Sequence, residues 1–173
     1  MILENREGSI HQIKMNRPDV RNAFNPEMIQ KITQIFKNLH HDKTVRAVTL
    51  EGEGSVFCAG ADLATMQSYV NASFDQNKAD AEKLHGLFQS IWSCEVPVIA
   101  CVQGAAYGGA LGLMAAADYV ICEEKAQLCF SEVKLGIAPA VISEFLFKKC
   151  NISFVSNWMI SGMQLSAHEA FIS

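Results

Sequence analysis

One apolar stretch, interrupted by glycines, constrains the fold of this chain more than any other part of the sequence. It covers residues 101–122, CVQGAAYGGALGLMAAADYVIC, and follows the apolar run Pro97–Ala100. That run has the length and flanks of a buried strand. From Gly109 the residues are good helix formers that are apolar on nearly every side, which indicates a helix buried in a core. The sequence therefore predicts a strand, a glycine loop and a buried helix.

The glycines before this helix make the loop a candidate anion site. Free backbone N–H groups and the positive end of the helix macrodipole point into such a loop, and Gly104, Gly108 and Gly109 would let a ligand atom approach the main chain. Close packing of the strand against the helix would also explain them. A nucleotide-phosphate loop is excluded, because the run contains neither G-x-G-x-x-G nor a closing lysine followed by serine or threonine.

A second stretch of small residues favours ligand binding over simple packing. Residues 55–63, SVFCAGADL, follow a strand-like run, Val45–Leu50, and again precede a helical segment. Two loops of this kind could each direct one N–H to the same negative oxygen. Two donors that converge where charge develops form an oxyanion hole, and losing one donor typically costs about 10²–10³ in rate.

Length and composition fit one globular domain over residues 1–173, with 50% hydrophobic and 18% charged residues. A net charge of -4 without a basic block gives nucleic-acid binding little support. The apolar runs are too short for a membrane span and the N-terminus is not a signal peptide, so we expect an intracellular, cytoplasmic protein without a membrane partner. The six cysteines form no C-x-x-C pair, so no metal site is expected.

Hydrophobic periodicity predicts alternating strands and helices along the rest of the chain. Strands are expected over residues 9–15, 45–50, 119–122 and 127–130, and helices over 26–40, 79–91, 140–149 and 153–160. The polar segment 66–78 has no clean period and is expected to be a mobile loop or an irregular helix. This alternation predicts an α/β fold with a mainly parallel sheet.

Several short motifs together resemble the crotonase superfamily, the family of enoyl-CoA hydratases and isomerases. The matching pieces stand in the order and spacing of that family: Asn16–Pro18, Asn22–Phe24, Phe57–Leu63, Pro97–Ala100, Gly104, Gly108–Gly109, Asp118 and Ser131–Gly136. The resemblance implies a spiral of ββα units with flanking helices. It also implies a homotrimer or dimer of trimers, held together largely by a C-terminal helical region.

The end of the sequence suggests that this helical region is missing or incomplete. Residues Ser166–Glu169 have the form of a capping box, which opens a helix, but only four residues follow. We therefore expect a truncated crotonase-like core domain in which the acyl pocket is not completed.

The resemblance further implies a thioester of coenzyme A as the ligand, with CoA as part of the substrate and no other cofactor. The amides of Ala61 and Gly109 match the two oxyanion-hole donors. The carbonyls of Ala59, Ala61 and Leu63 match those that hold the adenine. The full set of positions that match substrate-binding segments is Arg21, Ala23, Phe24, Ala59, Gly60, Ala61, Asp62, Leu63, Gly108 and Gly109.

Only one of the two glutamates that the family's hydratases commonly use is present. Glu132 matches the second, the first position is Gly112, and Asp118 matches a structural position rather than a catalytic one. Without its register to the two glycine loops, Glu132 would be interpreted as a surface carboxylate. One carboxylate can still act as acid and base when burial raises its pKa.

Three functions remain compatible with a single carboxylate. Glu132 alone could activate water, as a hydratase most like the methylglutaconyl-CoA hydratases of leucine breakdown, which the resemblance favours. It could instead shuttle one proton between carbons, as an enoyl-CoA double-bond isomerase. The chain could also bind CoA esters or partners as a non-catalytic scaffold, and other crotonase reactions such as decarboxylation stay open.

Overall fold

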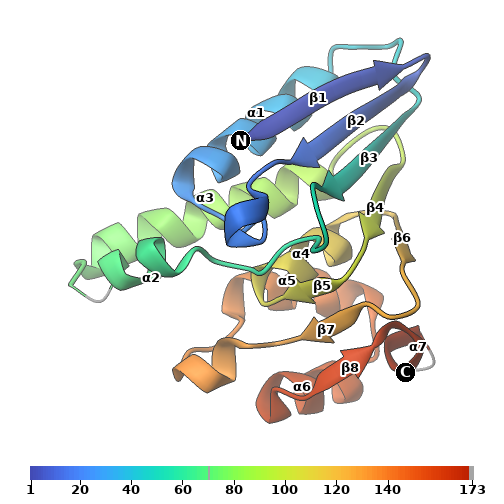
Figure 1. The fold of residues 1–173 in the computed structure, drawn as a ribbon. Coiled ribbons are helices and arrows are strands. Elements are labelled where there is room, and N and C mark those ends of the chain that lie inside the picture. The colour runs from blue at the N-terminus through green and yellow to red at the C-terminus, as the bar shows by residue number, and fades with distance from the viewer. Residues whose placement is uncertain (70, 172–173) are drawn as a thin grey trace.

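The computed structural model describes residues 1–69 and 71–171, which form two β-sheets with helices packed around them (Figure 1). The larger sheet has the strand order β1-β2-β3-β4-β6 and the smaller has β5-β7-β8. Their bounds are β1 Ile2–Glu7, β2 Ile10–Met15, β3 Ala47–Gly52, β4 Val98–Val102, β5 Ala105–Tyr107, β6 Tyr119–Cys122, β7 Gln127–Cys129 and β8 Gln164–Ser166.

Most strand pairs are parallel, as the alternation of strands and helices predicts. Strands β2, β3, β4 and β6 run parallel to one another, with Val48 opposite Val98 and Ile99 opposite Tyr119. Strand β5 is parallel to β7, whereas β1 and β8 join their sheets antiparallel. These last two strands and β5 were not predicted, because β1 is almost wholly exposed and the other two have three residues each.

Seven α-helices and two 3-10 turns connect the strands among the described residues. Their bounds are α1 Pro26–Leu39, α2 Leu63–Tyr69, α3 Phe74–Trp92, α4 Gly109–Ala116, α5 Ala140–Lys149, α6 Ile152–Ser161, α7 Ala167–Phe171, η1 Pro18–Val20 and η2 Glu132–Leu135. Helices α1 and α3 cover one face of the larger sheet (Figure 1). Helix α4 contacts both α3 and α5, and its residues are buried except Gly109 and Met114, as expected for the helix after the glycine loop.

The local sequence explains where two of these helices begin. Asn25 caps α1, its side chain accepting the Met28 N–H, with Pro26 at the first helical position. Ser73 caps α3 in a capping box with Gln76, whose side chain accepts the Ser73 N–H at 2.8 Å. Of the two alternatives for 66–78, the loop was wrong and the helical one was nearer: α2 and the first turn of α3 occupy most of the segment, and polar residues there cap a helix. Residue 70 lies outside the described residues.

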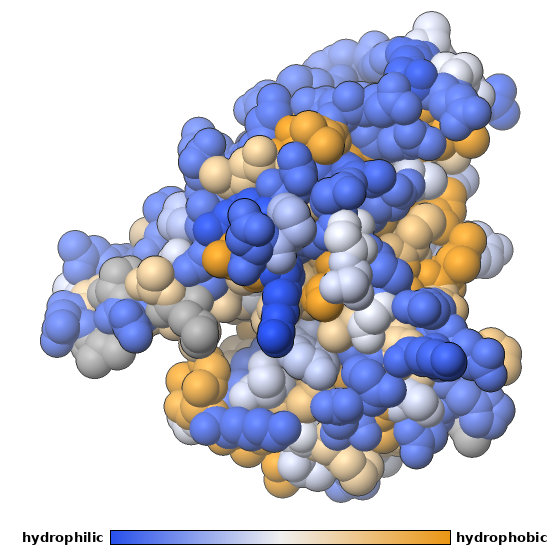
Figure 2. Space-filling model, in the orientation of Figure 1, coloured by the Kyte–Doolittle hydropathy of each residue, from blue (hydrophilic) through white to orange (hydrophobic). Residues whose placement is uncertain are grey.

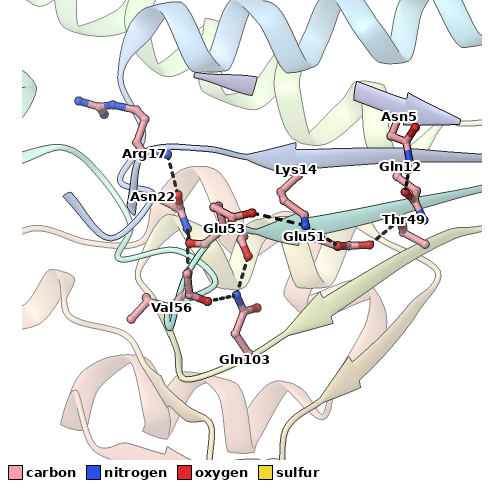
Figure 3. Close-up of polar contacts among 12 residues, drawn as sticks. Asn5, Gln12, Lys14, Arg17, Asn22, Thr49, Glu51, Glu53, Val56 and Gln103 are labelled. Carbon is pink, nitrogen blue, oxygen red and sulfur yellow. Dashed lines mark hydrogen bonds and ion pairs between the residues drawn. The ribbon is translucent and has the colours of Figure 1, made fainter. Parts of the chain in front are cut away.

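Two side-chain amides hold the turn that follows β3 (Figure 3). Asn22 is fully buried and donates to the carbonyls of Glu53 and Val56 at 2.9 and 2.8 Å, while its oxygen accepts the Arg17 N–H. From the other side, Gln103 donates to two carbonyls of the same turn. These bonds fix the segment from which the small-residue stretch 57–62 departs.

The edge strand β6 leaves apolar side chains at the surface. Tyr119 is 71% exposed and Ile121 64% exposed, and Figure 2 shows apolar side chains gathered on the side where β4 and β6 lie. Among residues 1–69 and 71–171, none of the helices combines the length and the apolar character needed to cross a bilayer.

Candidate active site

The two small-residue loops lie side by side, joined by backbone hydrogen bonds. The Phe24 N–H donates to the Gly60 carbonyl at 2.7 Å, and the Asp62 N–H donates to the Phe24 carbonyl at 2.8 Å. On the other side, the Tyr107 N–H donates to the Cys58 carbonyl at 3.0 Å. The segment that carries Ala61 is thus held between the loop before α1 and strand β5, which leads directly into α4.

Gly60 is required by the closeness of this approach. Its φ is +88°, and a Cβ at this position would lie 2.6 Å from the Tyr107 carbonyl oxygen and 3.7 Å from the Gly109 nitrogen. Ala61 is the next residue in the chain, so its amide is bonded to a residue that approaches the start of α4. In the described part of the chain, the amides of Ala61 and Gly109 donate to no backbone carbonyl. Gly109 stands in the first turn of α4, where helix N–H groups lack an intrahelical acceptor, whereas Ala61 lies two residues before α2.

Glu132 opens η2 and faces the same glycine loop. The Gly108 N–H donates to the Cys129 carbonyl at 2.9 Å, which ties the end of β7 to this loop. Glu132 Oε1 lies 3.0 Å from the position that a Cβ on Gly108 would occupy. Its Oε2 atom is buried and has no hydrogen-bond partner among the described residues. Burial raises the pKa of the Glu132 carboxyl above its usual range, against the opposing effect of its own backbone N–H.

A single cavity of about 220 Å³ brings six of the predicted residues together. The molecule is hollowed at this place in Figure 2, between α2 and the chain that follows Glu132. The predicted residues that line it are Phe24, Ala59, Ala61, Gly108, Gly109 and Glu132. Apolar side chains such as Leu84, Val141 and Ile142 form much of the remaining wall. The residues of two backbone donors thus line one cavity with a carboxyl that burial makes harder to ionise.

The other predicted binding residues do not line this cavity. Arg21 is exposed, and its carbonyl accepts the Ala59 N–H at 2.9 Å. Ala23 is buried, and Leu63 begins α2. Asp62 forms an ion pair with Arg17 at 2.8 Å, and that side chain lowers the pKa of the Asp62 carboxyl. Asp62 also accepts the Ala64 N–H, so this carboxylate fixes the start of α2.

The position of the family's first glutamate is closed by packing. A Cβ on Gly112 would lie 2.5 Å from Ile142 Cγ2 and 2.7 Å from Phe88 Cζ. Phe88 and Ile142 are themselves almost fully buried. No side chain can extend from residue 112 toward the cavity without moving both.

Sequence reasoning missed residues whose importance depends on packing. Phe88 and Ile142 block residue 112, and Leu84 lines the cavity, although the helix predicted over 79–91 already included Leu84 and Phe88. Ser131 also lines the cavity. Its place beside Glu132 in the motif was the only available signal.

A second, larger cavity lies on another side of α4 and holds none of the predicted donors. Its volume is about 450 Å³, and its charged lining residues are Asp118 and Lys149. Asp118 accepts the Val98 N–H at 2.8 Å, and the Lys149 ammonium donates to the Ala117 carbonyl. Both groups therefore brace the backbone, which confirms the structural role expected for Asp118.

Comparisons with known proteins agree with this geometry. Residues 5–172 match the enoyl-CoA hydratase/isomerase family. A Thermus thermophilus protein described as a candidate enoyl-CoA hydratase is 33% identical over 164 residues, covering 95% of this chain and 65% of that protein. The Alternaria alternata enoyl-CoA hydratase AKT6-1 is 29% identical over 154 residues, covering 89% of this chain and 50% of its own.

Solved structures share the fold. The enoyl-CoA hydratase of Shewanella pealeana superposes with a TM-score of 0.95 at 35% identity, covering 98% of this chain and 64% of that chain. The α/β spiral expected from the sequence motifs is thereby confirmed. The chain spans between half and two thirds of the length of these three relatives.

Proposed function

This chain belongs to the enoyl-CoA hydratase/isomerase family, and from that membership we propose that it adds water across the double bond of an α,β-unsaturated acyl-CoA thioester. One observation carries the proposal. In the part of the chain that the structure describes, one carboxylate oxygen of Glu132 is buried without a hydrogen-bond partner, and Glu132 lines the same cavity as Ala61 and Gly109, whose amides donate to no backbone carbonyl there.

Three groups carry the transfers of charge and protons in the proposed reaction. The amides of Ala61 and Gly109 hold the thioester oxygen, which gains charge as an enolate forms. Glu132 takes a proton from water while the water oxygen bonds to the β-carbon, and then returns a proton to the α-carbon. One H and one OH are added in total, and Glu132 ends as it began. A pKa raised by burial suits a group that must both accept and donate the proton.

The lining of the cavity favours an uncharged acyl group. Among the described residues, none of the side chains that line it is positively charged, and most are apolar. A methylglutaconyl group, which the sequence motifs suggest, carries a second carboxylate for which this lining offers no cation. We therefore place short, uncharged enoyl groups ahead of it.

The remaining contacts of the substrate follow from the family. We propose that CoA enters only as part of the substrate, that Arg21, Ala23, Phe24, Gly60, Asp62 and Leu63 flank its arm, and that the protein assembles as a trimer or dimer of trimers. Sedimentation of the purified protein measures the assembly.

Double-bond isomerisation is the second candidate, and the packing at residue 112 favours it specifically. An isomerase needs a single base, and Phe88 and Ile142 leave no room for a second carboxylate there. A scaffold that binds CoA esters without chemistry is the third candidate.

A panel of CoA thioesters separates the three. We expect crotonyl-CoA to lose its conjugated enoyl absorbance faster than methylglutaconyl-CoA does, with 3-hydroxyacyl-CoA as the product. If a β,γ-unsaturated thioester gains that absorbance while crotonyl-CoA does not lose it, the function is isomerisation and not hydration. Calorimetric binding of both compounds without turnover would leave the scaffold.

A further inference from the structure

The cavity that contains Glu132 has a second polar side chain. Of the described residues that line it, all are apolar or glycine except Ser131 and Glu132. In a reaction that adds water, a nucleophile placed among apolar groups must be held by whatever polar atoms remain. Among the described residues of that lining, Ser131 alone has a hydroxyl side chain.

The Ser131 hydroxyl is not used to support the fold. Ser131 stands at the N-cap position of η2, where serine commonly caps, yet its side chain makes no capping hydrogen bond. No hydrogen bond of this hydroxyl to another described residue is present, although the Ser131 carbonyl accepts the Lys134 N–H at 3.1 Å. The backbone of this residue therefore holds the turn while its hydroxyl stays free.

The hydroxyl and the carboxylate face the same point. A Cβ on Gly108 would lie 3.3 Å from Ser131 Oγ and 3.0 Å from Glu132 Oε1. Because Gly108 has no side chain, both oxygens can lie close to its backbone. Gly108 also has φ +54° and ψ -122°, a conformation that other residues rarely adopt, so this close approach is built into the backbone.

We propose that Ser131 is a catalytic residue that holds the attacking water together with Glu132. One O–H of the water donates to the Glu132 carboxylate, which removes that proton. The other O–H donates to Ser131 Oγ, so a lone pair of the water oxygen is left to form the bond to the β-carbon. Ser131 exchanges no proton in this step, and the balance of the addition is unchanged.

This role of Ser131 compensates for the absence of a carboxylate at residue 112. Residue 112 is closed by Phe88 and Ile142, so a water bound to Glu132 alone would be free to rotate. A second hydrogen bond fixes its orientation, and a misplaced reactant can cost about 10²-fold in rate. The inference rests on the proposed hydration, because neither isomerisation nor simple binding requires an oriented water.

The test compares two reactions of one protein that share Glu132 but differ in their need for water. Hydration of crotonyl-CoA needs the attacking water. Exchange of the α-protons of butanoyl-CoA with D2O, followed by NMR, needs only the base and the oxyanion donors. We expect Ser131→Ala to lower kcat for hydration about 10- to 100-fold and to leave the exchange rate within about twofold. Ser131→Thr, which keeps the hydroxyl, should retain most of the hydration.

Ser143→Ala is the matched control, because the Ser143 hydroxyl donates to the Ala140 carbonyl and Ser143 does not line the cavity. Equal loss of both reactions in Ser131→Ala would show a displaced Glu132 and overturn the inference. If the parent protein hydrates crotonyl-CoA and Ser131→Ala does so at the same rate, the inference is also overturned, but the proposed function stands. If the parent protein exchanges protons but adds no water, the proposed function fails and the inference with it.

Discussion

Two glycines of the same loop and helix, Gly108 and Gly112, have opposite surroundings. The atoms nearest to a Cβ on Gly108 belong to Glu132 and Ser131, whereas those nearest to a Cβ on Gly112 belong to Ile142 and Phe88. One glycine keeps a polar space open, and the other lets apolar side chains pack against a buried helix. The difference teaches that the described lining of the cavity includes one carboxylate, Glu132, and that the packing around Gly112 leaves no place for another. A reaction there must be run with one carboxylate.

Removing the charge from the polar wall should have the largest effect. Glu132→Gln keeps the size of the side chain but cannot accept a proton, so we expect turnover of crotonyl-CoA to fall by about 10²–10⁴-fold or more. Binding of butanoyl-CoA, measured by calorimetry, should change little, because the backbone donors of Ala61 and Gly109 remain. Initial rates at saturating substrate give the comparison.

The control for this variant is Glu82→Gln on α3, an exposed carboxylate whose ion pair with Lys78 spans 3.9 Å. It should retain full activity. Undiminished turnover in Glu132→Gln would show that Glu132 is not catalytic. The contrast between the surroundings of Gly108 and Gly112 would then have no bearing on the reaction.

Much of this contrast could be predicted from the sequence, but its cause could not. The apolar run Pro97–Ala100, the glycines and the all-round apolar pattern from Gly109 predict a strand, a loop and a buried helix, and the structure has them as β4, the loop before α4 and α4 itself. Motif register also places Glu132 near the two amides. The closure of residue 112 could not be predicted, because it depends on side chains from α3 and α5 that meet only after folding. Periodicity shows that Phe88 is inward, but not what it touches.

The apolar wall is tested by adding one methyl group. Gly112→Ala places a Cβ within 2.5 Å of Ile142 Cγ2, and such overpacking typically costs about 1–3 kcal/mol, of which the helix preference of alanine returns at most about 1 kcal/mol. Urea unfolding of the variant should therefore show a lower midpoint.

Gly86→Ala on α3 is its matched control. A Cβ there meets nothing within 4 Å, so this variant should gain about 0.5–1 kcal/mol in free energy of unfolding. Equal stability of the two variants would mean that the wall behind Gly112 yields easily, and a carboxylate at that position would no longer be excluded.

The smallest effect expected is on the pH dependence of stability, and it tests the burial of the polar wall. Burial raises the pKa of Glu132 in the native state, so the native protein holds this proton more tightly than the unfolded chain does. Between the two pKa values the unfolded state binds fewer protons, and the free energy of unfolding falls as pH rises. The whole penalty is present above the native pKa and absent below the unfolded one.

Glu132→Gln removes this titration. The variant should therefore match the parent protein in free energy of unfolding near about pH 4, and should become the more stable of the two as pH rises toward about 7, because only the parent ionises a buried carboxyl. Urea titrations at several pH values measure the difference. A difference that stays constant with pH would mean that the carboxylate is solvated, and Gly108 would then open onto bulk water rather than onto a cavity that holds one water in place.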